Sequence, residues 1–312
     1  MLSSIFSTLL SMRFLITIVR LATPIVFAAI GTFIASSTGI GNIAIESIMT
    51  FAALAGVIGS YLSGSAWVGV LFGMAIGIVT VMLIAFFSMK MGANAFLIMI
   101  ALNTFADSVA IFIMFLITGE KGTTASLSTP ILGSWDIPVI KDIPFLGEVI
   151  SGQYTLTYFC WLIVILLYIL VYKTPLGMRM RACGLNADAA RTAGINVERL
   201  QVLSLILSGI FAALGGVYLS LNYLKIFSRG MVSGQGWMGV AANGIAAGNY
   251  WVLILSALIF AVFRAVSILF SSNSAIPTDL VSAIPYLAVF VILTAVSIIN
   301  YYRVKRGKVE EQ

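Results

Sequence analysis

Histidine is absent from this 312-residue sequence, and charged residues are scarce, at 9% of the chain. The lack of histidine removes imidazole acid–base catalysis, the Ser/His/Asp triad and a common ligand of zinc and haem. Soluble domains carry about 25% charged residues, whereas 61% of this chain is hydrophobic. We therefore expect an integral membrane protein with no catalytic and no metal-binding residues.

The sequence has only two cysteines and lacks a phosphate-binding motif. Cys160 lies in an apolar segment and Cys183 in a basic one, so neither a disulfide nor a metal site is expected. A phosphate-binding Gly-x-x-x-x-Gly-Lys-[Ser/Thr] run is absent, since Gly307-Lys308 is followed by Val309. Any ATP must be handled by another chain.

Apolar stretches of about 20 residues, long enough to cross a bilayer, recur along the chain. The predicted membrane segments are 14–36, 42–62, 66–88, 93–117, 155–172, 201–222, 232–249, 250–270 and 280–300. We expect an all-α, polytopic membrane protein with about 8–10 transmembrane or broken helices. A single transmembrane domain would cover residues 1–312.

The distribution of charge predicts the orientation of these helices, because cytoplasmic loops are rich in lysine and arginine. Loop 173–200 carries five basic residues against two acids, and tail 301–312 is also basic, so both are expected in the cytoplasm. Loop 118–154 holds four acids against two lysines and is expected outside. Membrane topology therefore explains the net charge of +6, and nucleic-acid binding is not needed to account for it. Nine full crossings would place the N-terminus outside, although Arg13 and Arg20 favour the inside.

Two segments within the apolar part are rich in glycine and asparagine, residues 36–46 and 228–248. Irregular backbone at membrane depth is tolerated only when it is buried in protein or lines a cavity. Each segment leads to a tryptophan, Trp67 or Trp251, and then to a long apolar helix. The parallel predicts broken helices in two duplicated halves, a design found in transporters.

The basic loop predicts a short helix of its own. Pro175 ends the preceding helix, Asn186 offers a side-chain cap, and Gly194 closes a helix over Ala187 to Ala193. A helix of about two turns is unstable alone in water, so it must pack on this protein or on a partner.

The run Thr174-Pro-Leu-Gly-Met-Arg-Met-Arg-Ala-Cys-Gly-Leu-Asn-Ala-Asp-Ala-Ala-Arg-Thr-Ala-Gly-Ile-Asn-Val197 resembles the signature loop of bacterial ABC importer permeases. More narrowly, it is similar to the branched-chain amino acid, ribose and nucleoside permease superfamily. The runs Gly41-Asn-Ile-Ala-Ile-Glu-Ser47, Ala101-Leu-Asn-Thr-Phe105 and Ser233-Gly-Gln-Gly-Trp-Met-Gly-Val-Ala-Ala242 extend the likeness over most of the chain. They most resemble permeases that work with purine-nucleoside-binding lipoproteins. Glu46-Ser47 departs from the usual Glu-Gly.

The resemblance implies a type II ABC importer-like fold and a set of partners. These are an ATP-binding cassette ATPase, a second permease subunit that is a paralogue or another copy, a substrate-binding lipoprotein and membrane lipid, but no nucleic acid. ATP and Mg would be used by the ATPase, and this chain would bind no cofactor. The expected location of the chain is the bacterial cell membrane. The coupling helix that contacts the ATPase would comprise Leu185, Asn186, Ala187, Asp188, Ala189, Ala190, Arg191, Thr192, Ala193 and Gly194.

Polar and aromatic residues in the apolar segments are candidates for the translocation pathway: Asn42, Glu46, Asn103, Phe105, Asp107, Trp237 and Asn243. Intramembrane acids suggest function, but Glu46 and Asp107 have a structural alternative, pairing with Arg20 or Arg264. The asparagines can instead link helices by hydrogen bonds, and the aromatic residues can simply pack.

The predicted function is that of a non-catalytic permease subunit that forms the pathway for a small polar solute, with nucleosides as the predicted substrates. Branched-chain amino acids or sugars are the alternative substrates within the same superfamily. From another class, an ion-coupled secondary transporter would use Glu46 or Asp107 as its ion carrier.

Overall fold

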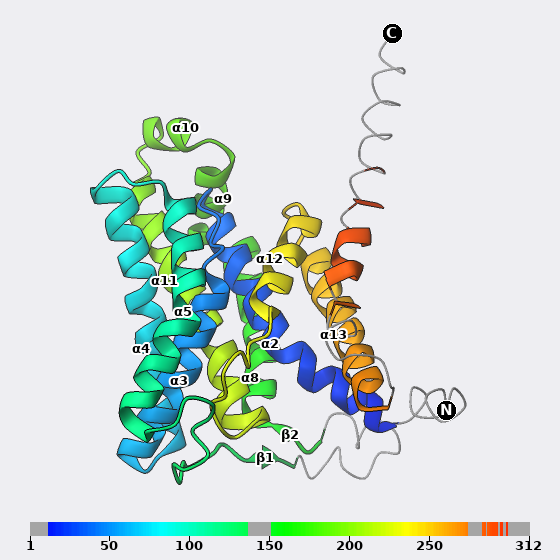
Figure 1. Ribbon diagram of the computed structural model, residues 1–312. Coiled ribbons are helices and arrows are strands. Elements are labelled where there is room, and N and C mark those ends of the chain that lie inside the picture. The colour runs from blue at the N-terminus through cyan, green and yellow to red at the C-terminus, as the bar shows by residue number, and fades with distance from the viewer. Residues whose placement is uncertain are drawn as a thin grey trace.

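The computed structural model describes residues 12–136 and 151–273, together with residues 283, 284, 286–292, 294, 295 and 298. Seven helices in these residues are long and apolar enough to cross a membrane. They are α2 (Met12–Ser36), α3 (Ile45–Ser63), α4 (Ala66–Ala85) with the π-helix η1 (Phe86–Lys90), α5 (Ala95–Thr118), α8 (Thr155–Lys173), α11 (Val197–Val217) with the π-helix η2 (Tyr218–Tyr223), and α13 (Tyr250–Asn273). The all-α, polytopic prediction is confirmed (Figure 1).

Helices α2, α3, α4 and α11 pack together as the centre of the bundle. Glycine permits the closest of these contacts, since a Cβ added to Gly77 would lie 2.6 Å from the carbonyl oxygen of Gly209. A Cβ on Gly209 would lie 2.8 Å from the carbonyl oxygen of Gly77. Between lipid-exposed helices, such small residues allow backbones to approach where larger side chains would hold them apart.

Two short helices close one end of the bundle and a strand pair lies at the other (Figure 1). Helices α9 (Pro175–Leu185) and α10 (Ala187–Thr192) follow α8 and cover the end at which α2 finishes. At the opposite end, β1 (Ser134–Trp135) pairs antiparallel with β2 (Gln153–Tyr154). The basic loop and the acidic loop therefore lie at opposite ends, as the charge pattern predicts.

The membrane segment predicted over 232–249 does not cross the bilayer as one helix. Its helix, α12 (Gln235–Ala246), has 12 residues and is about 18 Å long, too short for a hydrocarbon core of about 30 Å. Gly230 and Gly234 precede it with positive φ, and Ala247 and Gly248 follow it with positive φ, so the helix cannot extend in either direction. The expectation of a broken helix here is confirmed.

The segment before α3 is broken as well. The predicted span 42–62 begins as a helix only at Ile45, and Gly39 adopts a φ of 82° in the irregular connection from α2. Nine of the 21 residues of the predicted 280–300 segment, the tail 301–312 and residues 137–150 of the predicted outer loop lie outside the described residues.

Candidate translocation site and coupling loop

Helix α12 begins deep inside the bundle. At its far end, the carbonyl of Gly248 accepts a hydrogen bond of 3.0 Å from the hydroxyl of Tyr172, one residue before α8 ends at the basic-loop end of the bundle. Since α12 is about 18 Å long, its first turn lies at most about that far from this level. The first N–H groups of a helix have no partner inside the helix and need one from elsewhere.

Glu46, in the first turn of α3, supplies that partner. One carboxylate oxygen accepts a hydrogen bond of 2.7 Å from the N–H of Gly234, and the other accepts one of 2.8 Å from the N–H of Gly236. The N–H of Trp237 also interacts with this carboxylate. Because a helix N-terminus carries a partial positive charge, it stabilises the ionised acid. Glu46 thus joins the N-terminus of α3 to the N-terminus of α12.

Glycine at positions 234 and 236 makes this contact possible. A Cβ on Gly236 would lie 2.7 Å from both the backbone nitrogen and a carboxylate oxygen of Glu46. Gly234 has a φ of 77°, and the ring of Tyr286 lies against its Cα while the Tyr286 hydroxyl donates to the Ser233 carbonyl at 3.2 Å. These two glycines and Tyr286 were not among the predicted site residues. The run Ser233-Gly-Gln-Gly236 was the feature of the sequence from which the two glycines could have been predicted.

Asn103 of α5 holds the other side of the same junction. Its side-chain oxygen accepts from the N–H of Ser47 at 3.0 Å, and its amide donates to the carbonyl of Ile43 at 2.8 Å. Asp107, one turn further along α5, is exposed and lies within electrostatic range of Glu46. The structure therefore gathers Glu46, Asn103, Asp107 and the start of α12 with Trp237, which we call the Glu46 junction.

The remaining predicted pathway residues lie elsewhere. Asn42 is fully buried, donates to the Ser208 hydroxyl at 2.9 Å and accepts from the N–H of Ala44, so it links helices. Phe105 is 59% exposed. It points to a different side of α5 from Asn103, because residues two positions apart in a helix do not share a face. Asn243 lies at the opposite end of α12.

Pairing of the acids with arginine is not found in the described part of the chain. Arg20 instead donates from Nε to the side-chain oxygen of Gln153 at 3.3 Å and lies over the ring of Tyr154 at 4.6 Å. Neither Glu46 nor Asp107 forms an ion pair with Arg20 or Arg264 there. The backbone amides of α12 take the place of a cation for Glu46.

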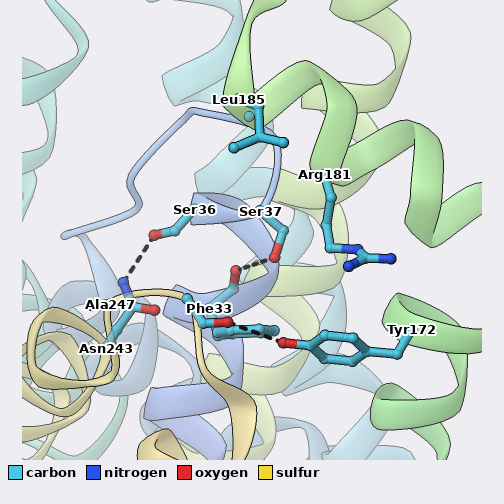
Figure 2. A pocket seen from close by; sticks show the side chains of 10 residues that line it. Phe33, Ser36, Ser37, Tyr172, Arg181, Leu185, Asn243 and Ala247 are labelled. Carbon is cyan, nitrogen blue, oxygen red and sulfur yellow. Dashed lines mark hydrogen bonds between the residues drawn. The ribbon is translucent and has the colours of Figure 1, made fainter.

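Asn243 belongs to a pocket of about 460 Å³ at the basic-loop end (Figure 2). Its amide donates to the Ser36 hydroxyl at 3.0 Å. Across the pocket, the guanidinium of Arg181 lies 4.9 Å from the ring centre of Tyr172, and its buried Nε has no hydrogen-bond partner among the described residues. The pocket joins the ends of α2, α8, α9 and α12 and so connects the membrane helices with the basic loop.

The caps predicted in the basic loop are confirmed. The side-chain oxygen of Asn186 accepts from the N–H groups of Asp188 and Ala189 at 3.1 and 3.0 Å, and Gly194 adopts a φ of 81°. The helix ends at Thr192, one residue earlier than predicted. It does not stand alone, because the 11-residue helix α9 precedes it.

Helix α10 buries its own inner face. Ala190 is only 4% exposed and packs with Cys183 and Val197 of the same chain. Burial raises the pKa of the Cys183 thiol, so this group stays protonated and apolar. The other predicted coupling residues are half-buried (Ala187) or exposed (Leu185, Asn186, Asp188, Ala189, Arg191, Thr192, Ala193, Gly194). Leu185 is 89% exposed, which is unusual for a large apolar side chain at the tip of a loop.

A polytopic helical bundle with broken helices is typical of membrane transport proteins. Residues 14–293 match the family model described as branched-chain amino acid transport system / permease component. The chain belongs to this family and is a multi-pass membrane permease subunit of an ABC importer.

Relatives and a solved structure agree with this assignment. The nucleoside ABC transporter permease protein NupC of Lactococcus lactis is 28% identical over 87% of this chain and 88% of its own length. The guanosine ABC transporter permease protein NupQ of Bacillus subtilis is 31% identical over 71% of each chain. A putative metal-chelate type ABC transporter, solved in an inward-facing conformation, superposes with a TM-score of 0.50 at 16% identity, covering 90% of this chain and 84% of that one. The last comparison supports the fold alone.

Proposed function

We propose that this permease imports nucleosides. The observation that carries the proposal is the similarity to the nucleoside permease NupC along 87% of the chain, joined by the guanosine permease NupQ. A nucleoside offers hydroxyls and a base edge for hydrogen bonds and a flat face for stacking. The Glu46 junction provides carboxylate and amide groups beside Trp237, whose side chain is 41% exposed.

The pathway is proposed to run along the exposed faces of α5 and α12. On α5, Thr104, Asp107 and Ser108 are exposed although the helix is long and apolar enough to span the membrane. Polar side chains facing hydrocarbon are costly, so this face is suited to water or protein rather than lipid. A second permease subunit would form the opposite wall, and stacking on Trp237 would contribute about 1–3 kcal/mol to binding of a base.

We further infer that the end bearing α9 and α10 faces the cytoplasm and docks a separate ATPase. Capped helices hold the loop rigid, while Leu185 and the polar face of α10 remain available for contact. This permease would then need no catalytic residues, and a binding lipoprotein would select the solute on the outer side.

Reconstituted transport tests the proposal. The permease, purified with its neighbouring ATPase and permease subunits and its lipoprotein, is placed in proteoliposomes and supplied with labelled guanosine, adenosine, leucine or ribose. We expect ATP-dependent uptake of the nucleosides and little uptake of leucine or ribose. Preference for leucine or ribose would contradict the proposal and assign this permease to the amino acid or sugar importers of the superfamily. Uptake driven by a proton gradient without ATP would instead support the ion-coupled mechanism.

A further inference from the structure

A second cavity lies on the flank of the bundle, between α4 with η1 and the beginning of α11. It has a volume of about 580 Å³, within the range of about 300–1,000 Å³ that small-molecule sites occupy. The two helices touch backbone to backbone at Gly77 and Gly209. Towards the basic-loop end they separate, and the cavity fills the wedge between them.

The walls of this groove are apolar and come from both helices. They include Met82, Phe86 and Met89 on one side and Val202, Leu203 and Ile206 on the other. Met82 and Phe86 remain 45% and 51% exposed, so the groove opens sideways from helices that span the membrane. Its surroundings are therefore lipid chains rather than water, and an apolar chain is the natural filling.

The end of the groove carries charge. Lys90, the last residue of η1, and Arg199, in the first turn of α11, line it together with one acid, Glu198. All three are exposed, and neither cation forms an ion pair within the described residues. Two cations against one acid leave an excess positive charge where a headgroup would lie.

We propose that this groove binds an anionic phospholipid, with one acyl chain between α4 and α11 and its phosphate between Lys90 and Arg199. Basic pockets between transmembrane helices on the cytoplasmic side recognise anionic headgroups, each cation contributing modestly to the attraction. The orientation proposed above assigns the lipid to the inner leaflet, whereas the site itself rests only on the groove and its two cations. A bound lipid would link α4 to the N-terminus of α11, the helix that begins directly after the basic loop.

Native mass spectrometry of the purified transporter, with this full chain and its partner subunits, measures the binding directly. Phosphatidylglycerol and phosphatidylcholine with identical acyl chains serve as probes. We expect phosphatidylglycerol to bind at least tenfold more tightly, Lys90→Gln and Arg199→Gln to weaken it about fivefold each, and the double variant about thirtyfold. The matched control is the double variant Lys173→Gln with Arg179→Gln, which removes two exposed cations from the same end of the bundle outside the groove.

A photoreactive group on the acyl chain locates the bound lipid. Crosslinks are expected on the segments around Met82 and Ile206, and Ile206→Trp, which fills the groove, should abolish them without removing either cation. Equal retention of the two lipids, or equal losses in the groove and control variants, would overturn the proposal. Crosslinks from Lys90 and Arg199 to the ATPase, with lipid excluded, would also overturn it and identify the groove as a protein contact.

Discussion

At the scale of single residues, the proposed pathway contains a carboxylate whose partners are backbone amides. Glu46 binds the N–H groups of Gly234 and Gly236 at the start of α12, which have no partner inside the helix. A charged acceptor is suited to a helix N-terminus, and the contact ties α12 to α3. The same geometry disfavours Glu46 as a mobile ion carrier, because releasing the carboxylate would leave two buried N–H groups unpaired.

The first prediction concerns the charge of Glu46. In Glu46→Gln, an amide N–H₂ must face one of the two backbone N–H groups, so one hydrogen bond is lost and the other is weakened. Hydrogen bonds to charged groups are worth about 1.5–3 kcal/mol, so we expect a clear fall in melting temperature in detergent and at least tenfold slower ATP-driven uptake. Glu120→Gln, the same change at an exposed loop position, should behave as the unchanged protein. Unaltered uptake by Glu46→Gln would contradict the structural role given to this contact.

The second prediction compares two glycines of the same helix. A methyl group at Gly236 would lie 2.7 Å from Glu46, whereas Gly244 has no atom within 4 Å of such a group. Gly236→Ala should therefore separate α12 from Glu46, destabilise the protein by about 1–3 kcal/mol and reduce transport. Gly244→Ala should be neutral or slightly stabilising, since alanine is favoured over glycine in helices by about 1 kcal/mol. The melting temperature and the uptake of both variants are measured side by side. Equal effects of the two substitutions would contradict the prediction.

At the scale of elements, the capped pair α9 and α10 forms one unit with an internal core. Ala190, Cys183 and Val197 share that core, so the inner face of α10 is already occupied. A glutamate at Ala190 would disturb the loop itself rather than only a contact with the ATPase. Leu185 and the exposed residues of α10 are the better probes of coupling.

The third prediction follows from this distinction. Leu185→Asp changes an 89% exposed side chain and should leave the melting temperature within about 1 °C, because surface substitutions are usually near neutral. We expect it to reduce co-purification of the ATPase and to uncouple ATP hydrolysis from uptake. Met178→Asp on α9, also exposed at 57%, provides a comparison away from α10. Full co-purification and coupling in Leu185→Asp would exclude Leu185 as a docking residue.

At the scale of the whole molecule, the two ends of the bundle differ in structure. The basic loop with α9 and α10 lies at one end, and the strand pair lies at the other (Figure 1). Both native cysteines are buried, Cys160 fully and Cys183 at 2% exposure. The unmodified chain therefore provides a low background for cysteine labelling.

The fourth prediction uses that background to determine orientation. Ala189→Cys on α10 and Ala125→Cys in the opposite loop each introduce one exposed thiol. A membrane-impermeant maleimide should label Ala125→Cys in intact cells and Ala189→Cys only in inside-out vesicles. The reverse pattern would invert the proposed topology, while labelling of both from one side would contradict the number of crossings between them.

Several features of this protein follow from the sequence alone because they depend on local chemistry. Apolar length predicts the spanning helices, and the contrast in charge between loops 118–154 and 173–200 predicts that these loops lie at opposite ends. Asn186 and Gly194 bound α10 through contacts within a few residues, so their roles can be read directly. The glycine-rich runs before α3 and α12 likewise mark breaks, because glycine supplies the positive φ angles that end a helix.

Tertiary structure alone decides what each polar side chain contacts. The sequence places Glu46 in an apolar segment and suggests an arginine as its partner, whereas folding brings the N-terminus of α12, about 190 residues later, against it. The separation of Asn103 from Phe105 also depends on which face of α5 packs on α3. Hydropathy reports that a polar group lies in a membrane segment, but its partner is chosen by the packing of distant helices, because only there do unpaired donors and acceptors meet.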